Sequence, residues 1–485
     1  MKPILRSNLS RLLTLLPLTA LWLASGCSRV DHKQSTLDPK GLVAQNQYDV
    51  FMLSVWLTIF LFCAVGGCLL FVLWKYRAKN ADEAKEVPPQ THGNSKVEGS
   101  LIIASAVLLV VLAVPTLQGV VLMNRVPDPN DEAHLEKLGI DKYAVENPLT
   151  VNVTGKRFFW VFEYPEYGIV TANELVFPVN RAVRLNLRTT DVIHSFWLPK
   201  LAGKMDLMPG QENFMWFIAN KEKLLVKTDK DGAITELDDS QIAEAMPAVH
   251  DGTLRKKIFE KRDFTDEFDP VGGFFYGQCA EYCGNSHARM MFRAIAQTES
   301  DFNLWVQRFQ DAQNSGKLPQ AYDPEKAYAA GEVVLHEDES LVKNDQGEPE
   351  VVMREYRAES NASTAQTPST ATAIWKPAHS DLYERGKFFF TASKCNECHA
   401  VNRVGLEYKG PNLTLFGLRA SLAAGWMRND KESLAEWLKN SNDIKFGNLM
   451  WNGEGVDDEH PLRKLREEKN KDKVDALVAY LLEQD

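Results

Sequence analysis

The sequence is poor in cysteine, which excludes a protein held together mainly by disulfides. Its 485 residues include seven cysteines, and each lies in a segment that has its own explanation. Basic residues are fewer than acidic ones. The 55 Lys and Arg and the 65 Asp and Glu give a formal charge of -10. This charge argues against a nucleic-acid partner. The sequence also has no internal repeat, phosphate-binding glycine loop or hydrolase triad. What remains is a chain long enough for several domains.

The first 26 residues have the pattern of a secretory signal. A basic start precedes an apolar run over 12–23, and the run ends at Ala24-Ser-Gly-Cys27. Small residues before a cysteine are typical of a bacterial lipoprotein cleavage site, so we expect Cys27 to become the lipidated first residue of the mature chain. Plain cleavage and an uncleaved anchor are the alternatives. Residues 27–46 then form an N-terminal segment.

Two long runs, 50–74 and 99–123, contain no charged residue. Each is about 25 residues, or roughly 37 Å as a helix, which is enough to cross a ~30 Å hydrocarbon core. Five basic residues lie between the runs and acidic residues follow the second, so the positive-inside rule places the connection in the cytoplasm. We therefore expect membrane helices at 47–76 and 98–124 with a cytoplasmic loop at 77–97. The rest of the chain then lies on the periplasmic or outer face of a bacterial inner membrane.

The most informative segment is a short loop rich in soft metal ligands. Cys279, Cys283, His287 and Met290 fall within twelve residues. Thiolate, thioether and imidazole together suit copper, zinc or iron rather than magnesium or calcium. A structural zinc loop or a disulfide is the alternative, but a thioether is not a usual zinc ligand. The loop therefore favours copper.

This loop resembles the binuclear CuA loop of cytochrome c oxidase subunit II. Upstream, Asp191-Val-Ile-His194-Ser195 matches the family segment that carries a further histidine. The Lys204-Met-Asp206 and Pro209-Gly210 segments match the family as well. The resemblance implies a cupredoxin-like β-sandwich that holds two coppers in its end loops.

The resemblance also implies a role for each ligand. Cys279 and Cys283 would bridge the two coppers, and His194 and His287 would each terminate one. Met290 would be a weak ligand, and Glu281 would bind through its main-chain carbonyl. In the family, the side chain of that glutamate also helps to hold magnesium or manganese at the boundary with subunit I.

Strand patterns support a sandwich over 145–312. Leu149–Thr154 and Val183–Arg188 alternate apolar and polar residues, as half-buried strands do. Short strands separated by turns are typical of a sandwich or barrel. Residues 220–269 are charged and lose this pattern, so we expect an insertion on the domain surface there, a solvated excursion rather than a docking site. Asp238 begins a short capped helix within it.

Two positions depart from the family. Phe158 stands where the family has an exposed tryptophan that accepts electrons from soluble cytochrome c, and Trp160 keeps the second tryptophan of that segment. Most aromatic residues of such a cluster form the sheet core. Glu98 matches a glutamate at a proton-channel entrance, but the tryptophan that normally follows is absent. An interfacial anchor is the simpler reading of Glu98.

A second cofactor motif lies near the C-terminus. Cys395-Asn-Glu-Cys398-His399 is a C-x-x-C-H haem attachment motif, with a disulfide or zinc knuckle as the minor alternative. Residues 381–485 are similar to a small all-α c-type cytochrome, in which His399 and Met450 would be the axial ligands of haem c. The alternatives for the sixth ligand are Met427 and, more distantly, His379 and His460. Residues 315–380 have the composition of a flexible linker.

Together these segments predict a multidomain membrane protein: a two-helix transmembrane hairpin, a cupredoxin-like β-sandwich and a c-type cytochrome domain. The combination resembles subunit II of a caa-type cytochrome c oxidase, which relays electrons from haem c to CuA and on to haem a. The resemblance implies subunit I and subunit III as partners, with a c-type cytochrome or a quinol-oxidising complex as donor. Alternatives are a copper subunit of a nitric oxide reductase, a copper-free quinol oxidase subunit II and a stand-alone electron shuttle.

Overall fold

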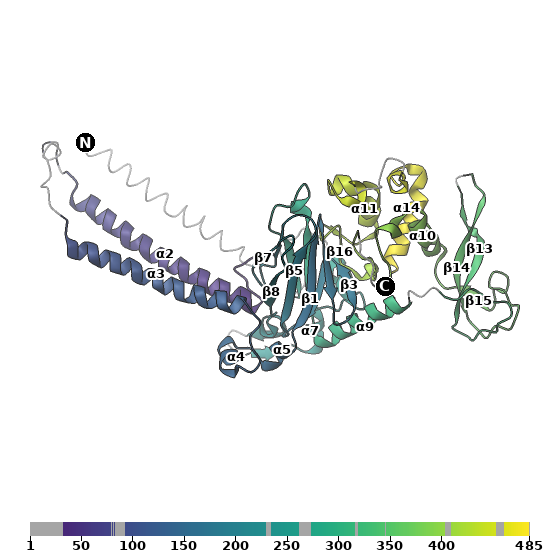
Figure 1. Ribbon diagram of the computed structural model, residues 1–485, viewed down its shortest axis with the longest axis horizontal. Helices are drawn as coiled ribbons and strands as arrows, with labels where there is room; N and C mark the ends of the chain where they lie inside the picture. Colours follow the sequence, from purple (N-terminus) through teal and green to yellow (C-terminus); the bar gives the residue numbers. More distant parts are fainter. Residues whose placement is uncertain are drawn as a thin grey trace.

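The chain is elongated, with four folded parts in a row (Figure 1). The computed structural model describes residues 33–78, 80, 82, 93–228, 234–260, 273–315, 319–344, 346–402, 409–452 and 460–484. A helical hairpin lies at one end, a β-sandwich follows, a small helical domain contacts the sandwich, and a small sheet lies at the far end. The expected lipidation at Cys27 lies outside the described residues.

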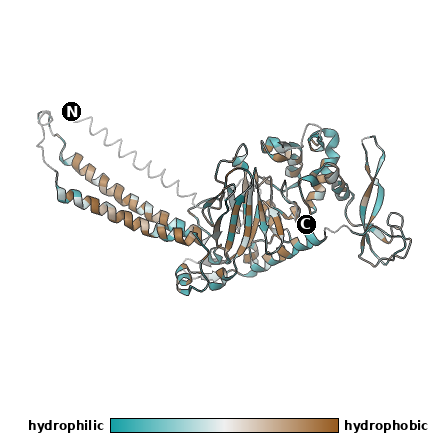
Figure 2. Ribbon diagram, in the orientation of Figure 1, coloured by the Kyte–Doolittle hydropathy of each residue, from teal (hydrophilic) through white to brown (hydrophobic). Residues whose placement is uncertain are grey.

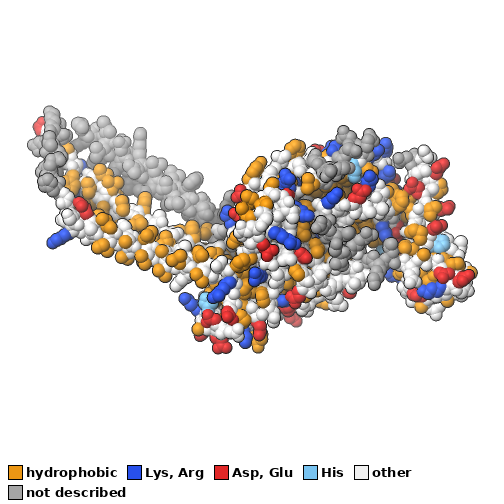
Figure 3. Space-filling view, in the orientation of Figure 1, with side chains coloured by type: hydrophobic (Ala, Val, Ile, Leu, Met, Phe, Trp, Pro, Cys, Tyr) orange, Lys and Arg blue, Asp and Glu red, His pale blue; other side chains and the backbone are white. Residues whose placement is uncertain are grey.

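The hairpin consists of α2 (Leu42–Lys75) and α3 (Ser95–Met123), which run side by side (Figure 1). Their 34 and 29 residues correspond to about 51 and 44 Å, longer than a ~30 Å hydrocarbon core. The most apolar stretch of each is not buried by any described part of the chain. Hydrophobic residues predominate along both helices (Figure 2), and hydrophobic side chains cover much of the hairpin surface that faces the viewer (Figure 3). The predicted two-helix hairpin is therefore confirmed, with α2 beginning at Leu42 instead of residue 47.

The sandwich has two five-stranded sheets. The first has the order β3-β2-β1-β5-β8 and contains β1 (Leu149–Lys156), β2 (Phe159–Tyr164), β3 (Ile169–Ala172), β5 (Val183–Thr189) and β8 (Asn213–Phe217). The second has the order β4-β12-β11-β6-β7 and contains β4 (Glu174–Pro178), β6 (His194–Trp197), β7 (Lys204–Leu207), β11 (Phe274–Cys279) and β12 (Met291–Gln297). Strand β1 is parallel to β5 and β12 is parallel to β4, whereas the other neighbours are antiparallel. The predicted cupredoxin-like sandwich is confirmed.

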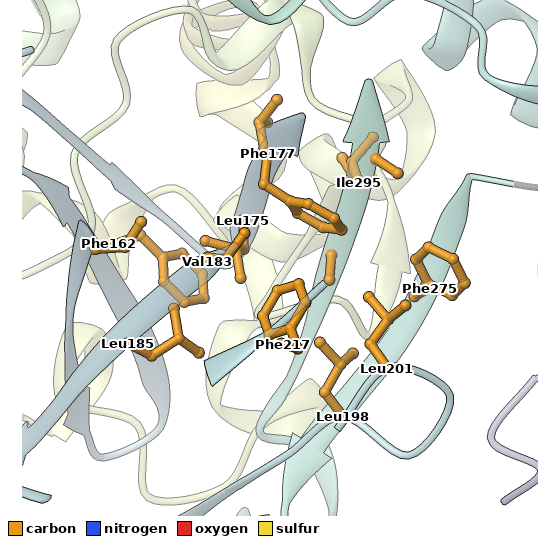
Figure 4. Packing of buried hydrophobic residues seen from close by; sticks show 14 of the residues in the cluster. Phe162, Leu175, Phe177, Val183, Leu185, Leu198, Leu201, Phe217, Phe275 and Ile295 are labelled. Atoms are coloured by element: carbon orange, nitrogen blue, oxygen red, sulfur yellow. The ribbon is translucent and has the colours of Figure 1, made fainter. Parts of the chain in front are cut away.

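The core lies between the two sheets (Figure 4). Phe162, Leu185 and Phe217 from the first sheet meet Phe177 and Ile295 from the second, and all are buried. The alternation of β5 follows the sequence pattern, because its apolar residues are buried and its arginines are exposed. Helix α9 (Glu299–Ser315) packs along β3, β4 and β12 and closes one side of this core. The end loops of a rigid sandwich are thereby held in place.

The insertion expected at 220–269 is part of the fold. It contains α6 (Lys221–Leu225), β9 (Val226–Thr228), β10 (Ile234–Glu236), α7 (Asp239–Ala245) and α8 (Thr253–Glu260). The capped helix predicted at Asp238 is α7, where the carboxylate of Asp238 accepts a hydrogen bond from the main-chain N–H of Gln241. The expectation of a solvated excursion is wrong, because Met246, Leu254 and Ile258 are buried in the sandwich core. The insertion carries many charged residues, so its sequence does not show that these few apolar residues are buried.

The linker expected at 315–380 is also a folded module in its described part. Strands β13 (Val333–Lys343), β14 (Pro349–Ala358) and β15 (Trp375–Pro377) form an antiparallel sheet. Tyr328, Tyr356 and Trp375 form a small core on it. The prediction of a flexible tether is wrong because the Ser- and Thr-rich turns cover this aromatic core. The indole N–H of Trp375, for example, donates a hydrogen bond to Gln366 O at 2.7 Å.

The C-terminal domain agrees with the predicted small helical fold. Its helices are α10 (Asp381–Ala392), α11 (Lys431–Ile444), α12 (Leu449–Asn452), α13 (Pro461–Lys464) and α14 (Lys471–Leu482). The described part of the domain also contains a short antiparallel hairpin, so it is not entirely helical. Its strands, β16 (Ser421–Leu422) and β17 (Met427–Arg428), have two residues each. Helices α10 and α14 cross at Gly386, where a Cβ atom would lie only 2.0 Å from Ala476 O. A glycine is therefore required at this crossing.

Candidate functional site

The predicted metal loop joins two neighbouring strands of the sandwich. Cys279 ends β11 and Met290 immediately precedes β12, so the loop closes a hairpin at one end of the second sheet. His194 begins β6, and β6 pairs with β11 so that Phe196 faces Cys279. This pairing brings a histidine that is 85 residues distant in the chain next to the loop. Gly155 leaves room for it, because a Cβ atom there would lie 3.0 Å from the His194 ring.

The structure gathers all six predicted ligands. Cys279 Sγ lies 3.9 Å from Cys283 Sγ and 3.8 Å from His194 Nδ1. Cys283 Sγ in turn lies 3.7 Å from His287 Nδ1 and 3.8 Å from Met290 Sδ. The remaining ligand atom, the main-chain carbonyl oxygen of Glu281, lies 3.2 Å from Cys279 Sγ. Two thiols therefore stand at the centre, with one imidazole beside each.

The neighbours of the ligands set their protonation. His194 Nε2 lies 2.8 Å from Asp191 Oδ1, which fixes the ring and leaves Nδ1 facing Cys279. Burial alone would raise the pKa of Asp191, but hydrogen bonds from His194 and from the N–H groups of Arg157 and Val192 lower it to about 2. A hydrogen bond from Cys283 lowers the pKa of Cys279 to about 4, and the same bond raises the pKa of Cys283. One thiolate charge is thus already stabilised within the pair.

The donor set fits a pair of copper ions. Both cysteines are free and buried, and His194 and Met290 are completely buried. Sulfur and imidazole donors in a dry site suit copper, and the thioether is not a usual zinc ligand. The alternative of a disulfide does not fit two thiols that each contact a different imidazole.

The two aromatic residues singled out in the sequence are both buried. Trp160 is completely buried, with its ring edge-on to Phe196 and Phe292 and 6.1 Å from the His194 ring. Phe158 is 5% exposed and lies against Gly284 of the metal loop. Its main-chain carbonyl accepts a hydrogen bond from the ammonium group of Lys445, a residue of the C-terminal domain. The surface on which a soluble donor would reach Phe158 is therefore covered by this chain itself.

The predicted haem attachment motif forms one tight turn, in which the N–H of His399 donates a hydrogen bond to Cys395 O at 2.9 Å. His399 Nδ1 lies 2.8 Å from Pro411 O, so Nδ1–H donates to this carbonyl and Nε2 is left as the free ligand atom. Burial lowers the pKa of His399, which keeps the imidazole neutral. Gly410 is needed beside it, since a Cβ atom there would lie 2.7 Å from the ring. Cys395 and Cys398 are free and half-buried. These residues fit a covalently bound haem.

The candidates for the sixth ligand differ in their surroundings. Met450 in α12 and Met427 in β17 are both half-buried against the hydrophobic core that Cys395 also contacts. His379 instead stacks on Tyr383 and lies 3.6 Å from Glu355 Oε2. His460 Nδ1 accepts a hydrogen bond from the N–H of Leu462 and caps α13. The two histidines thus have structural partners of their own, which favours the methionines.

The C-terminal domain is docked on the sandwich through buried polar contacts. Glu174 of β4 accepts hydrogen bonds from the N–H and the hydroxyl of Ser421, at 2.9 and 2.7 Å. Burial raises the pKa of Glu174, while Ser421 and the cations of Arg419 and Arg293 oppose the rise. Leu415 and Leu418 join the main core of the sandwich. This interface is built like the interior of a domain.

The insertion takes part in the same interface. Arg255 of α8 donates two hydrogen bonds to Asn429 O, at 3.2 and 2.8 Å. Asn429 is completely buried, and its amide donates to Phe416 O and Arg419 O within the C-terminal domain. The insertion therefore supports the docked domain, which the sequence analysis did not anticipate.

Sequence reasoning also missed the residues that contact the C-terminal domain from the metal loop. Ser286 and Arg289 lie within the recognised motif but are not ligands, and Lys445 of the C-terminal domain lies five residues before Met450, the expected axial ligand. The one available signal was a lysine between two apolar residues, Ile444 and Phe446. Glu98, by contrast, lies exposed in the first turn of α3, as expected for a residue at a helix end.

Comparisons with known proteins agree with the motifs. Residues 169–231 match the family model "Cytochrome C oxidase subunit II, periplasmic domain". The chain is 29% identical to cytochrome c oxidase subunit 2 of Bacillus sp. strain PS3, over 97% of this chain and 96% of that protein. It is 27% identical to cytochrome c oxidase subunit 2 of Alkalihalophilus pseudofirmus, over 90% of each chain.

A solved structure is similar as well. The periplasmic domain of subunit II of cytochrome oxidase of Bradyrhizobium japonicum is 27% identical, covering 33% of this chain and 91% of that one, with a TM-score of 0.22. The resemblance stated from the sequence is confirmed by the relatives that span nearly the whole chain.

Proposed function

Because the chain is a homologue of cytochrome c oxidase subunit II along most of its length, we propose that it is the electron-accepting subunit of a caa-type haem–copper oxidase. Its C-terminal domain would receive electrons on haem c, and the sandwich would pass them through CuA to haem a of subunit I. Reduction of oxygen to water, coupled to proton translocation, would take place in subunit I. The two described membrane helices are too few to enclose an oxygen site of their own.

One observation carries this proposal: the domain that contains the C-x-x-C-H motif is docked on the loop that contains the candidate copper ligands. Lys445 of the C-terminal domain contacts Phe158, and Phe158 lies against Gly284 of the metal loop. A fixed donor removes the need for a diffusing cytochrome to dock at Phe158. This arrangement supports an intramolecular relay.

We assign the ligands as the motifs suggest. His194, Cys279, Glu281, Cys283, His287 and Met290 would hold the copper pair. Cys395 and Cys398 would bind haem c covalently, with His399 and Met450 as axial ligands. A copper pair in such a site supplies rapid one-electron exchange. The rigid sandwich contributes by holding the six donors in nearly one geometry.

The partners follow from the exposed surfaces and the family. The apolar faces of α2 and α3 need lipid or another membrane subunit, which supports an assembly with subunit I and subunit III in a bacterial inner membrane. Glu281 is half-buried on the metal loop, where its carboxylate would share magnesium or manganese with subunit I. Glu98 would stand at the entrance of a proton channel. The donor to haem c would be a c-type cytochrome or a quinol-oxidising complex.

Purification in mild detergent tests the proposal. We expect the complex to contain haem a together with haem c, and to give the electron paramagnetic resonance signal of one electron shared by two coppers. A chain that separates alone, without haem a, would contradict the oxidase assignment and leave a stand-alone shuttle. A copper signal from this chain, together with a large subunit that carries haem b instead of haem a, would favour the nitric oxide reductase alternative. A copper-free complex would point to a quinol oxidase subunit.

A further inference from the structure

A short segment of the C-terminal domain lies directly against the metal loop. We call residues 444–447 the strap; it leaves α11 at Ile444 and leads into α12 at Leu449. Ser286 Oγ donates a hydrogen bond to Phe446 O at 2.7 Å, and the guanidinium group of Arg289 donates to Ile444 O. Both donors flank His287 in the sequence. The turn that carries a proposed copper ligand is therefore bonded to the strap on either side of that ligand.

The strap also donates hydrogen bonds of its own, to the sandwich and within the C-terminal domain. Lys445 is 3% exposed, and its ammonium group donates to Phe158 O and, at 3.1 Å, to Ala423 O. The Arg289 guanidinium also lies over the ring of Trp426, 5.2 Å from its centre. Gly447 has a positive φ of 78°, and a Cβ atom there would lie 3.2 Å from the Asn285 amide. Close contact thus runs along the whole strap.

The other end of the strap is fixed to the segment that carries Met450. Asn448 is buried, and its amide donates to Ser441 O and Lys445 O, at 3.0 and 2.8 Å. Its side-chain oxygen accepts a hydrogen bond from the N–H of Trp451 at 3.0 Å. Met450 lies between these fixed points, four residues after Phe446. A series of hydrogen bonds therefore connects the metal loop to the residues that flank Met450.

We propose that the strap is a positioning element shared by the two cofactor sites: Ser286 and Arg289 hold it against the metal loop, so that ordering of either site orders the other and the electron path between them stays short. This inference rests on the proposed function for the identity of the two cofactors. Ser286 and Arg289 are positioning residues that act through the strap. Neither one is a ligand, so a change at either position leaves both donor sets complete.

Arg289→Gln in the full-length complex tests the proposal, with Ser286→Ala as a second variant. The matched control is Arg181→Gln, because Arg181 also donates to a main-chain carbonyl of the sandwich domain, Asn147 O at 2.7 Å, but has no hydrogen bond to a described residue of the strap or the metal loop. We expect Arg289→Gln to keep haem c content and the copper resonance signal. Electron transfer from haem c to copper after flash reduction should fall by roughly tenfold or more, because small misplacements change such rates strongly. Arg289→Lys should recover part of that rate.

Two readouts are independent of oxidase activity. Hydrogen–deuterium exchange at amides 444–449 should rise in Arg289→Gln and Ser286→Ala and stay unchanged in Arg181→Gln. The absorption band of thioether-ligated haem should weaken in the first two variants and, in the unmutated chain, after copper is removed with a chelator. Equal rates, bands and exchange in Arg289→Gln and Arg181→Gln would overturn the proposal. If Arg289→Gln shows faster exchange at 444–449 but the purified complex lacks haem a, the positioning role of the strap is supported and the oxidase assignment is contradicted.

Discussion

At the scale of single residues, the chain surrounds each cofactor ligand with a partner that orients it. Asp191 shows this for the metal loop, since its carboxylate holds His194 Nε2 and leaves Nδ1 for the metal. Pro411 does the same for the haem motif by accepting from His399 Nδ1. In both cases a hydrogen bond fixes which ring nitrogen is available, which is the usual role of such partners in metal sites. The motifs predicted the ligands, and Asp191 was within reach of sequence reasoning because it belongs to a motif.

Asp191→Ala should therefore weaken copper binding without removing a ligand. Loss of the orienting carboxylate lowers metal affinity by roughly 10- to 100-fold in comparable sites. Copper content measured by titration against a competing chelator gives the affinity. Asp191→Asn should retain part of it, because an amide oxygen still accepts from the ring. Asp128→Ala, at an exposed position five residues after α3 ends, is the control, and an equal loss there would contradict the assigned role.

A buried ion pair joins the membrane hairpin to the sandwich. Lys200 is 1% exposed, and its ammonium group lies 3.0 Å from Asp38 Oδ2, just before α2 begins. Main-chain bonds from Lys40 and Gly41 to Lys200 O reinforce the junction. Removing one partner of a buried pair leaves the other uncompensated. This pair therefore fixes how the sandwich stands on its membrane anchor.

Lys200→Met should lower the stability of the sandwich by roughly 1–2 kcal/mol, less than the loss of one partner from an isolated buried pair, because Lys40 still pairs with the Asp38 carboxylate. Thermal unfolding of the detergent-solubilised complex, followed by circular dichroism, measures the loss. Lys40→Met is the matched control: Lys40 also pairs with Asp38, at 2.9 Å, but its side chain is 28% exposed. A loss below about 1 kcal/mol is expected there. If both variants unfold alike, the pair does not have the role given to it.

At the scale of elements, the sequence predicted the segments in which all residues, or all residues on one face, have the same surroundings. The membrane helices are uniformly apolar, and β5 alternates because one face of its sheet is buried. The insertion and the module of β13, β14 and β15 were missed, since each buries a few residues beneath a highly charged surface. In β13 the alternation is also broken by an irregular register between Asp338 and Val342. Local patterns do not reveal contacts made with distant parts of the chain.

The crossing of α10 and α14 is the element contact on which the C-terminal domain depends most. Gly386→Ala would place a Cβ atom 2.0 Å from Ala476 O and 2.6 Å from Tyr480, both in α14. The helices must then separate, which typically costs about 1–3 kcal/mol or more. We expect less covalently bound haem and a lower unfolding temperature of this domain, measured by haem stain and by loss of the haem absorption on heating. Gly99→Ala in α3, with open space around it, should leave both unchanged.

At the scale of the whole molecule, the parts after the hairpin form a continuous series of contacts. The metal loop contacts the strap, α8 contacts Asn429, and β14 contacts α10. The sequence predicted the presence of the two cofactor domains but not that they are rigidly joined, because interface residues such as Lys445 and Arg255 have no local signature. Some of the acidic residues of the chain have partners in these contacts. Glu174 accepts a hydrogen bond from Ser421, and Glu355 pairs with Lys387.

The last contact in this series is expected to depend on pH. Glu355 of β14 forms ion pairs with Lys387 of α10 and with His379, which precedes α10. Burial alone would raise the pKa of Glu355, but the hydrogen bonds and charges of His379 and Lys387 lower it from 4.5 to about 2. A depressed carboxylate pKa stabilises the folded contact above about pH 4.5. That contribution, roughly 2 kcal/mol after allowing for solvent screening, is lost as the pH falls toward 2.

A fluorophore on Gln346→Cys, in the turn between β13 and β14, makes this undocking measurable. Haem c quenches a nearby dye, so emission should rise as the pH is lowered from 4.5 to 2 and the module separates from α10. In the Glu355→Gln background the titrating group is gone, and we expect brighter emission at neutral pH with a much smaller response to acid. Asp381→Asn is a useful companion, because Asp381 pairs with Arg354 at the same contact but its side chain is 76% exposed. An unchanged acid response in Glu355→Gln would show that another group controls how the module is held.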